Sequence, residues 1–225
     1  MSVRGKMSVF PVRDNISRIL KELPPGAELE AACKTRSANE IQQAVDAGVR
    51  ILGENYVSEA LKVHPLVRGP VRWHFIGHLQ RNKVKKALKV FDMIETLDSW
   101  ALAETLSEKS AGNGKAVECL VEINSAREKN KYGLYPEEAE GFVAEAAKLK
   151  NLRIRGLMTM GPFTEDPEEA RPYFSLTRRI YESMRDKIPG CRMEILSMGM
   201  SSTYRVALTE GANIVRVGTA LFGPR

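Results

Sequence analysis

Lys34 is the residue in this sequence whose position best suits covalent chemistry. It follows the largely apolar segment 28–33 and precedes the hydroxyl-bearing Thr35. Lysine is rare at the inner end of a buried strand, because removing its ammonium group from water is costly. Where burial is tolerated, it lowers the pKa of the amine, and the neutral amine is a nucleophile toward carbonyl carbons. Lys34 is therefore a candidate for a covalent link to an aldehyde.

Two segments near the end of the chain combine glycine with hydroxyl side chains. Residues 197–203 lead from an apolar run into a predicted helix, and residues 217–220 follow the next apolar run. Hydroxyl groups and the amides of a first helical turn donate to anions, although N-capping and a tight turn are ordinary alternatives. At adjacent strand ends, the two segments predict a phosphate cup, and with Lys34 they would suit a phosphorylated aldehyde such as pyridoxal 5'-phosphate (PLP). The candidate residues of this cup are Ser201, Ser202, Gly218 and Thr219.

Two further polar residues follow or interrupt apolar strands. Arg216 lies in the apolar segment 214–217, where a guanidinium group requires either an internal ion pair or a ligand. Asn55 follows the apolar segment 49–52, and its side chain could bond the edge of a ligand or cap its own helix. Both residues are candidates for the same site.

His74 and Met158 are candidates whose ordinary role is in the core. We expect His74 to point into the fold or toward its rim, and a lone histidine on an apolar strand is most often a satisfied core residue. His74 and His78 have no carboxylate partner at the spacing of a metal site, so we expect no metal. Met158 and Met160 are expected to pack beneath the site, as methionines commonly do.

Short apolar runs alternate with amphipathic stretches along the whole chain, which is the pattern of βα units. A helix over about 11–23 comes first. The predicted strands are 28–33, 49–52, 72–76, 91–95, 116–123, 153–158, 193–196 and 213–217. Helices are predicted between them, among them 39–47, 100–110, 167–187 and 203–210. Eight alternations favour one α/β domain over 1–225, a (β/α)8 TIM barrel, with a doubly wound open sheet as the alternative.

Composition restricts the class of protein. A hydrophobic fraction of 43% and a charged fraction of 28% are typical of soluble globular chains. No apolar run reaches the roughly 20 residues of a membrane span, and residues 1–7 do not resemble a secretion signal. Three widely spaced cysteines, Cys33, Cys119 and Cys191, suit buried free thiols in a reducing cytoplasm. We therefore expect a cytoplasmic protein with no membrane association.

The net charge of +6 raises the question of a polyanionic partner. The densest basic segment, 81–89, has Val84, Ala87 and Leu88 at helical spacing. This pattern favours an amphipathic helix with a solvated cationic face. Nucleic-acid binding is the alternative, but no aromatic side chains alternate with the basic residues to stack on bases. We expect no nucleic-acid partner.

Six segments resemble, in their order along the chain, the YggS/PROSC pyridoxal phosphate homeostasis proteins. They are Cys33-Lys34-Thr35, Gly53-Glu54-Asn55-Tyr56-Val57, Trp73-His74-Phe75-Ile76-Gly77-His78-Leu79-Gln80, Gly156-Leu157-Met158-Thr159-Met160, Ser197-Met198-Gly199-Met200-Ser201 and Val215-Arg216-Val217-Gly218-Thr219-Ala220-Leu221-Phe222-Gly223. The resemblance extends from about residue 10 to the end. The chain departs from the family pattern at Cys33, where serine is usual, and at Thr203, where aspartate is usual.

The resemblance implies a barrel similar to the N-terminal domain of alanine racemase, the fold type III of PLP proteins. It implies PLP bound as an internal aldimine on Lys34, with Ser201 and Thr219 at the phosphate. It also implies that Arg216 faces the pyridine nitrogen and that Asn55 lies near the ring. Replacement of aspartate by Thr203 should leave the lysine chemistry intact and makes the capping of the following helix less certain.

Two functions are compatible with this cofactor. The first is PLP homeostasis, in which the protein holds PLP and supplies or buffers it for apoenzymes, as a monomer or weak homodimer. The second is a small PLP-dependent amino-acid racemase, which an arginine at the pyridine nitrogen disfavours because it weakens the ring as an electron sink. Only nine residues follow Arg216, so we also expect no C-terminal domain to provide a second base. A phosphate-binding barrel enzyme without PLP is a third, more distant alternative.

Overall fold

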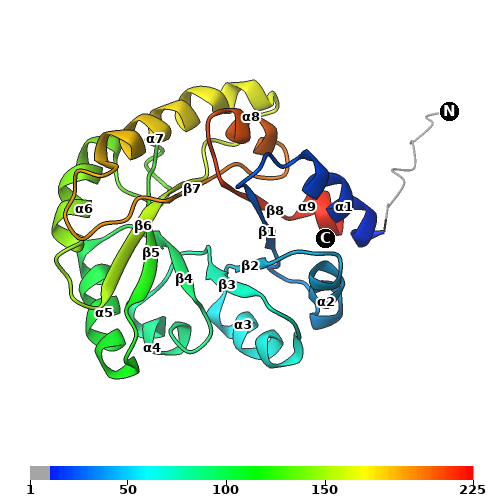
Figure 1. Ribbon diagram of the computed structural model, residues 1–225, viewed down its shortest axis with the longest axis horizontal. Helices are drawn as coiled ribbons and strands as arrows, with labels where there is room; N and C mark the ends of the chain where they lie inside the picture. Colours follow the sequence, from blue (N-terminus) through cyan, green and yellow to red (C-terminus); the bar gives the residue numbers. More distant parts are fainter. Residues whose placement is uncertain (1–10, 225) are drawn as a thin grey trace.

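Eight parallel strands close into a barrel inside a ring of helices in this computed structural model, which describes residues 11–224 (Figure 1). The strands are β1 Glu28–Ala32, β2 Ile51–Glu54, β3 Arg72–Phe75, β4 Met93–Leu97, β5 Val117–Glu122, β6 Leu152–Thr159, β7 Ile195–Met198 and β8 Ile214–Val217. Each strand pairs with the next one in sequence, and β8 pairs with β1. The predicted (β/α)8 barrel is confirmed, and closure between β1 and β8 excludes the open sheet.

The helices surround the barrel and cover the outer faces of its strands (Figure 1). They are α1 Val12–Glu22, α2 Ala38–Asp46, α3 Val57–Val63, α4 Val84–Ala87, α5 Trp100–Ser110, α6 Ala139–Ala146, α7 Arg171–Met184, α8 Tyr204–Thr209 and α9 Thr219–Phe222. Short 3-10 helices add η1 His64–Leu66, η2 Arg81–Lys83, η3 Ala111–Asn113, η4 Pro136–Glu138 and η5 Pro167–Ala170. Helix α1 lies beside α9, where Asn15 Nδ2 donates to Leu221 O at 3.1 Å.

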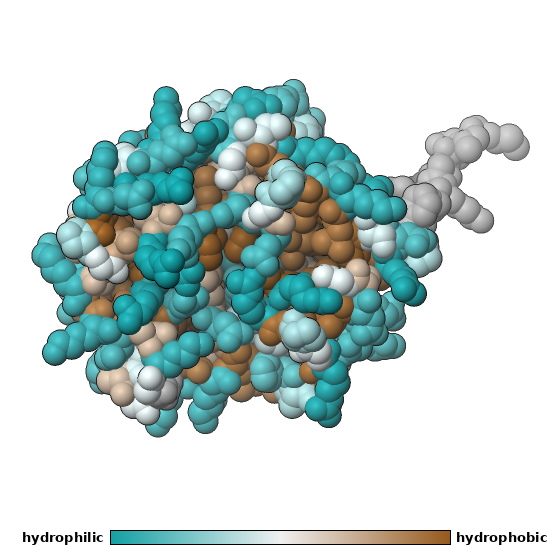
Figure 2. Space-filling view, in the orientation of Figure 1, coloured by the Kyte–Doolittle hydropathy of each residue, from teal (hydrophilic) through white to brown (hydrophobic). Residues whose placement is uncertain are grey.

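The core has two parts because the strands are buried on both faces, as parallel strands usually are. The larger part fills the space between strands and helices. A small apolar cluster of Met93, Leu120 and Met158 lies apart from it, with Met160 and Ile195 against it. Polar side chains from β1, β3, β4, β7 and β8 are also buried, which is unusual for a barrel interior. Seen from the face in Figure 2, hydrophilic residues form the rim and apolar residues gather between them.

Three strands begin two residues later than the sequence predicts. These are β2, β4 and β7, and a shift of two residues leaves the inward and outward faces unchanged. Apolar runs mark buried residues, whereas a strand begins where its neighbour can pair with it. The shift places Ser197 inside β7, although we expected it in the following loop.

The basic segment forms less helix than predicted. Residues 81–83 are the 3-10 helix η2, and α4 adds only Val84–Ala87. Val84 and Ala87 are buried, whereas the basic side chains of the segment are exposed, so its amphipathic character is confirmed. Among residues 11–224, no helix has both the length and the apolar character that crossing a membrane would require.

Candidate functional site

A cleft of about 510 Å³ lies at the C-terminal ends of the strands, where barrel enzymes carry their chemistry. The loops after β1, β2, β3, β6, β7 and β8 contribute to it. Its lining residues are Ala32, Lys34, Arg36, Asn55, Ile76, Met160, Phe163, Met200, Ser201, Ser202, Arg216, Gly218 and Thr219. Seven of the nine residues expected at the site are in this set. His74 and Met158 are not.

Lys34 follows β1 by two residues and is half-buried in the cleft. The next residue, Thr35, has φ of 67°, a left-handed conformation that is strained for a β-branched residue. Its backbone amide donates to Glu59 Oε2 at 3.0 Å. Two residues further on, Ser37 and Glu40 form a capping box that begins α2. The strained turn is thus fixed on both sides, and it directs Lys34 into the cleft.

Ser201 joins the loop after β7 to the loop after β8. Its Oγ accepts hydrogen bonds from Gly218 N at 3.2 Å and from Ala220 N at 3.3 Å. The expected alternative, a serine cap on α8, is wrong, since the N-cap of α8 is Thr203 and makes no side-chain cap. Backbone amides therefore converge on one hydroxyl at the edge of the cleft, a donor arrangement that suits an anion such as a phosphate.

Arg216 lines the cleft from β8, although its side chain is only 4% exposed. Its Nη1 donates to Ser197 Oγ at 2.5 Å, and its Nη2 donates to Thr159 O at 2.8 Å. Glu95 Oε2 lies 3.9 Å from Nη1. Both alternatives for Arg216 are therefore present, because it has an internal ion pair and also reaches the cleft.

Asn55 lines the cleft from the loop after β2. It does not cap α3, because the N-cap of that helix is Tyr56. Gly77 packs directly against its backbone, and a Cβ at Gly77 would lie 2.2 Å from Asn55 O. The glycine in the segment after β3 is therefore required for this close approach.

His74 differs from its prediction in its partners. Its Nδ1 lies 2.7 Å from Glu95 Oε1 and 3.8 Å from Glu30 Oε2, so the expectation that it lacks a carboxylate partner is wrong. The potential ligand atoms of Glu30, His74 and Glu95 lie within 4.8 Å of one another, close enough to share a metal ion. Sequence spacing missed this cluster because barrel closure, rather than sequence proximity, brings the three strands together.

Met158 is fully buried in the apolar cluster inside the barrel, as expected of a methionine beneath the site. Met160 instead reaches the cleft. Sequence reasoning also missed Arg36 and Phe163 at the mouth. The side chain of Phe163 is 89% exposed, and its place in the segment 160–163 after a predicted strand was the available signal.

The two departures from the family pattern have local explanations. Cys33 is buried, its Sγ donates to Ala31 O at 3.1 Å, and burial raises the pKa of its thiol well above the usual value. Thr203 Oγ1 accepts a hydrogen bond from Met200 N at 3.1 Å, which closes the turn before α8. Neither side chain lines the cleft.

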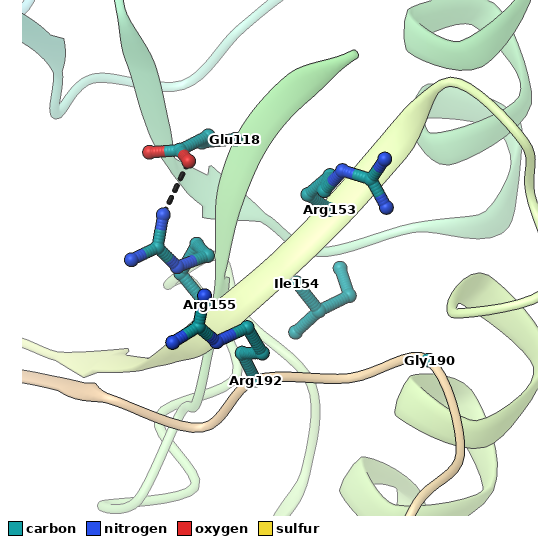
Figure 3. A pocket seen from close by; sticks show the side chains of 6 residues that line it. All are labelled: Glu118, Arg153, Ile154, Arg155, Gly190 and Arg192. Atoms are coloured by element: carbon teal, nitrogen blue, oxygen red, sulfur yellow. Dashed lines mark hydrogen bonds and ion pairs between the residues drawn. The ribbon is translucent and has the colours of Figure 1, made fainter.

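A second cleft, of about 390 Å³, lies near the N-terminal ends of β5 and β6 (Figure 3). At this cleft the partly exposed Arg155 contacts both Glu118 and Glu194 (Figure 3 shows the first pair). Because these carboxylates neutralise Arg155, and because this end of a barrel commonly serves stability, we assign the chemistry to the first cleft.

Comparisons with known proteins agree with this geometry. The family model described as the alanine racemase N-terminal domain matches residues 10–225. A pyridoxal phosphate homeostasis protein of Aquifex aeolicus is 34% identical, and the alignment covers 94% of this chain and 97% of that protein. The protein of the same name from Homo sapiens is 36% identical, over 95% of this chain and 82% of that one.

Solved structures extend the comparison to the fold. PipY of Synechococcus elongatus with PLP bound is 33% identical, with a TM-score of 0.87, covering 94% of this chain and 100% of that one. An alanine racemase of Clostridium difficile has a TM-score of 0.76 at 19% identity, which shows a shared fold alone. This chain covers 95% of its own length but 56% of the racemase in that comparison.

Proposed function

The chain belongs to the family of pyridoxal phosphate homeostasis proteins, and on that premise we propose that it binds PLP in the first cleft. We further propose that it holds the cofactor for intracellular homeostasis and supplies or buffers it for apoenzymes. The observation that carries the proposal is the convergence of Lys34 with the Ser201 loop and the amides of the β8 turn in one cleft.

The residues of the cleft suit the functional groups of PLP. Lys34 would hold the aldehyde carbon covalently, and Ser201, Ser202, Gly218 and Thr219 would bind the phosphate. Arg216 would contact the pyridine nitrogen, and Asn55 would lie at the ring. His74 and Met158 would support the site from inside the barrel. When bound, PLP supplies a reactive aldehyde that links reversibly to amines.

The racemase alternative is not favoured. Arg216 is permanently charged and donates to Ser197 and Thr159, so it cannot protonate a pyridine nitrogen or act as a base. Two-base racemisation also needs a second acid or base opposite Lys34. Among the cleft residues that the structure describes, the ionisable ones besides Lys34 are Arg36 and Arg216. Neither is suited to that role.

The proposed compartment is the cytoplasm. Cys33, Cys119 and Cys191 are free thiols in the structure, which suits a reducing compartment. The proposed recipients of the cofactor are PLP-dependent apoenzymes, and transfer to an apoenzyme is measured directly below.

Replacing Lys34 tests the site. Purified wild-type protein should show an absorbance band of the covalent adduct, lost on borohydride reduction, and mass spectrometry should place the reduced adduct on a Lys34 peptide. Lys34→Ala should lose the band and bind PLP weakly. Lys62→Ala, on the exposed face of α3, is the control and should behave as wild type. An adduct on another lysine, such as Lys131, would refute the assignment.

A transfer experiment tests the role. PLP-loaded protein and an equal concentration of free PLP are each mixed with an apoenzyme, and the activation rates are compared. A carrier should activate the apoenzyme while protecting PLP from an added scavenging amine. An alanine racemase assay is run beside it. Turnover on the order of 1 per second or faster would favour the racemase instead.

A further inference from the structure

A chain of buried polar contacts runs from the cleft into the barrel. Glu95 is fully buried on β4, and each of its carboxylate oxygens has a different partner. Oε1 lies 2.7 Å from His74 Nδ1, and Oε2 accepts a hydrogen bond from Ser197 Oγ at 2.7 Å. Ser197 Oγ in turn accepts from Arg216 Nη1 at 2.5 Å. The guanidinium group in the cleft is therefore connected to the imidazole inside the barrel through a single carboxylate.

Glu30 lies at the far end of this chain of contacts. Its Oε2 is 3.8 Å from His74 Nδ1, and among residues 11–224 neither of its oxygens has a hydrogen-bond partner. The neighbouring strand makes room for it, since a Cβ at Gly53 would lie 2.0 Å from Glu30 Oε1. The carboxyl group is thus accommodated by the backbone of β2 next to His74.

The charges along the chain of contacts alternate at neutral pH. Burial opposes ionisation of Glu95, but the hydrogen bond and charge of His74 and the charge of Arg216 outweigh it and lower the pKa of Glu95 to about 2. Burial likewise opposes the imidazolium, but Glu30 and Glu95 raise the pKa of His74 to about 9. Burial and the nearby Glu95 raise the pKa of Glu30 to about 8. An anionic Glu95 therefore lies between the imidazolium of His74 and the guanidinium of Arg216, and Glu30 holds its proton more tightly than an exposed carboxyl group does.

We propose that Glu95 is a positioning residue for PLP, which fixes Arg216 in the cleft through Ser197 and is itself fixed by His74. This inference rests on the proposed function, because Arg216 is the residue through which Glu95 acts on the cofactor. An arginine on a flexible stem needs such anchoring to present its fork in one orientation. Oε2 of Glu95 provides it through Ser197, from β4 across the barrel from β8, while His74 holds Oε1.

A metal ion is the competing occupant of the Glu30–His74–Glu95 cluster. His74 Nδ1 and Glu95 Oε1 are already at hydrogen-bond distance, 2.7 Å, and the other oxygen of Glu95 is bonded to Ser197. A metal ion bound to His74 Nδ1 and Glu95 Oε1 would have to break the contact between these two atoms. The hydrogen-bonded arrangement therefore explains the geometry better, and metal binding becomes an outcome of the test.

The first test is a double-mutant cycle on PLP affinity. Glu95→Gln keeps the shape of the side chain but removes its charge, and it should weaken PLP binding by about tenfold to a hundredfold. Ser197→Ala should weaken binding in the same direction. In an Arg216→Gln background, Glu95→Gln should have little further effect on PLP affinity, because the guanidinium group that Glu95 positions is absent. Glu54→Gln, which removes a buried carboxyl group with no contact to Arg216, is the control.

The second test uses protein without cofactor. Nuclear magnetic resonance of labelled histidines should show His74 protonated up to about pH 9 in the wild type. Glu95→Gln should lower this pKa, whereas Glu54→Gln should not. Zn²⁺ added alone should leave the His74 signal unchanged. A Zn²⁺-dependent shift that Glu95→Gln abolishes would replace our proposal with a metal site.

The outcomes separate the two proposals. If no adduct forms on Lys34, the proposed function fails whatever Glu95 does. If the adduct forms but Glu95→Gln has equal effects with and without Arg216, or leaves PLP affinity unchanged, the positioning role alone is refuted. If Glu95→Gln lowers thermal stability but changes neither PLP affinity nor the pKa of His74, Glu95 has only a structural role.

Discussion

Single side chains at the cleft each connect two segments of the chain. Ser201 is an example, because its hydroxyl accepts from two backbone amides after β8 while belonging to the loop after β7. A bound phosphate would compete for the same amides, since each has one proton to donate. The position of Ser201 therefore links phosphate binding to the packing of the two loops.

Removing the hydroxyl groups should weaken binding of the phosphate. Ser201→Ala and Thr219→Val should each reduce PLP affinity by about one to two orders of magnitude, since a hydrogen bond to a charged group is worth about 1.5–3 kcal/mol. Titration calorimetry with PLP and with pyridoxal measures this effect. Wild type should bind PLP more tightly than pyridoxal, and this preference should be smaller in the two variants. Ser183→Ala on α7 is the control and should match wild type. Equal affinity of wild type for both ligands would show that the phosphate cup is misplaced.

The residues that line the cleft were more predictable than those that support them. Lys34, Ser201 and Arg216 were identifiable because their residue types are unusual beside apolar strands. The roles of Glu95 and Ser197 were not, because their contact joins β4 to β7 across 102 residues of sequence. The available signal was a charged residue within an apolar run, at Glu30 and again at Glu95.

At the scale of elements, the spacing of apolar residues predicted which segments form helices and strands. Pairing with neighbouring strands decided where the strands begin. Helix α5 matches its predicted range, because its apolar spacing is bounded by Ser99 and a glycine-containing turn. The loop after β7 could not be placed so well, since its conformation depends on Gly199. That residue has φ of 86°, and a Cβ there would lie 2.6 Å from Ala207 Cβ and 2.9 Å from Tyr204 Cα.

Gly199→Ala should therefore disturb both stability and binding. The left-handed conformation alone costs a residue with a side chain about 1–2 kcal/mol, and the clash with α8 adds to this. Gly211→Ala is a matched control, because its φ is 88° but its Cβ would meet only the Arg178 side chain, at 3.6 Å. Urea denaturation should show a larger loss for Gly199→Ala, accompanied by weaker PLP binding. Equal losses would mean that backbone strain, not the close approach, sets the requirement for Gly199.

At the scale of the whole molecule, closure of the barrel buries ionisable groups from several strands. Burial is the main reason that the pKa values of Glu54 and Glu122 rise to about 7, and nearby carboxylates add to it. A carboxyl group that binds its proton more tightly in the folded state stabilises the fold only while it is protonated. His74 also binds its proton more tightly in the folded state, since its pKa is raised from 6.5 to about 9, so it too stabilises the fold while it is protonated. Glu95 acts in the opposite sense, since its pKa is lowered from 4.5 to about 2.

The free energy of unfolding should therefore be greatest in mildly acid solution. Between pH 4.5 and about 7 the folded state releases the protons of Glu54 and Glu122 later than the unfolded state does, so stability falls as pH rises. His74 extends the fall to about pH 9, and Glu95 causes a loss below pH 4.5. A shift from 4.5 to about 7 corresponds to about 3 kcal/mol for Glu54, on the order of 1.4 kcal/mol per pKa unit. Urea denaturation at intervals from pH 4 to 9 measures the curve. Glu54→Gln should make the free energy of unfolding depend less on pH below pH 7. The fall above pH 7, which His74 causes, should be unchanged in this variant. A wild-type free energy of unfolding that rises from pH 5 to 9 would contradict the assignment of buried protons.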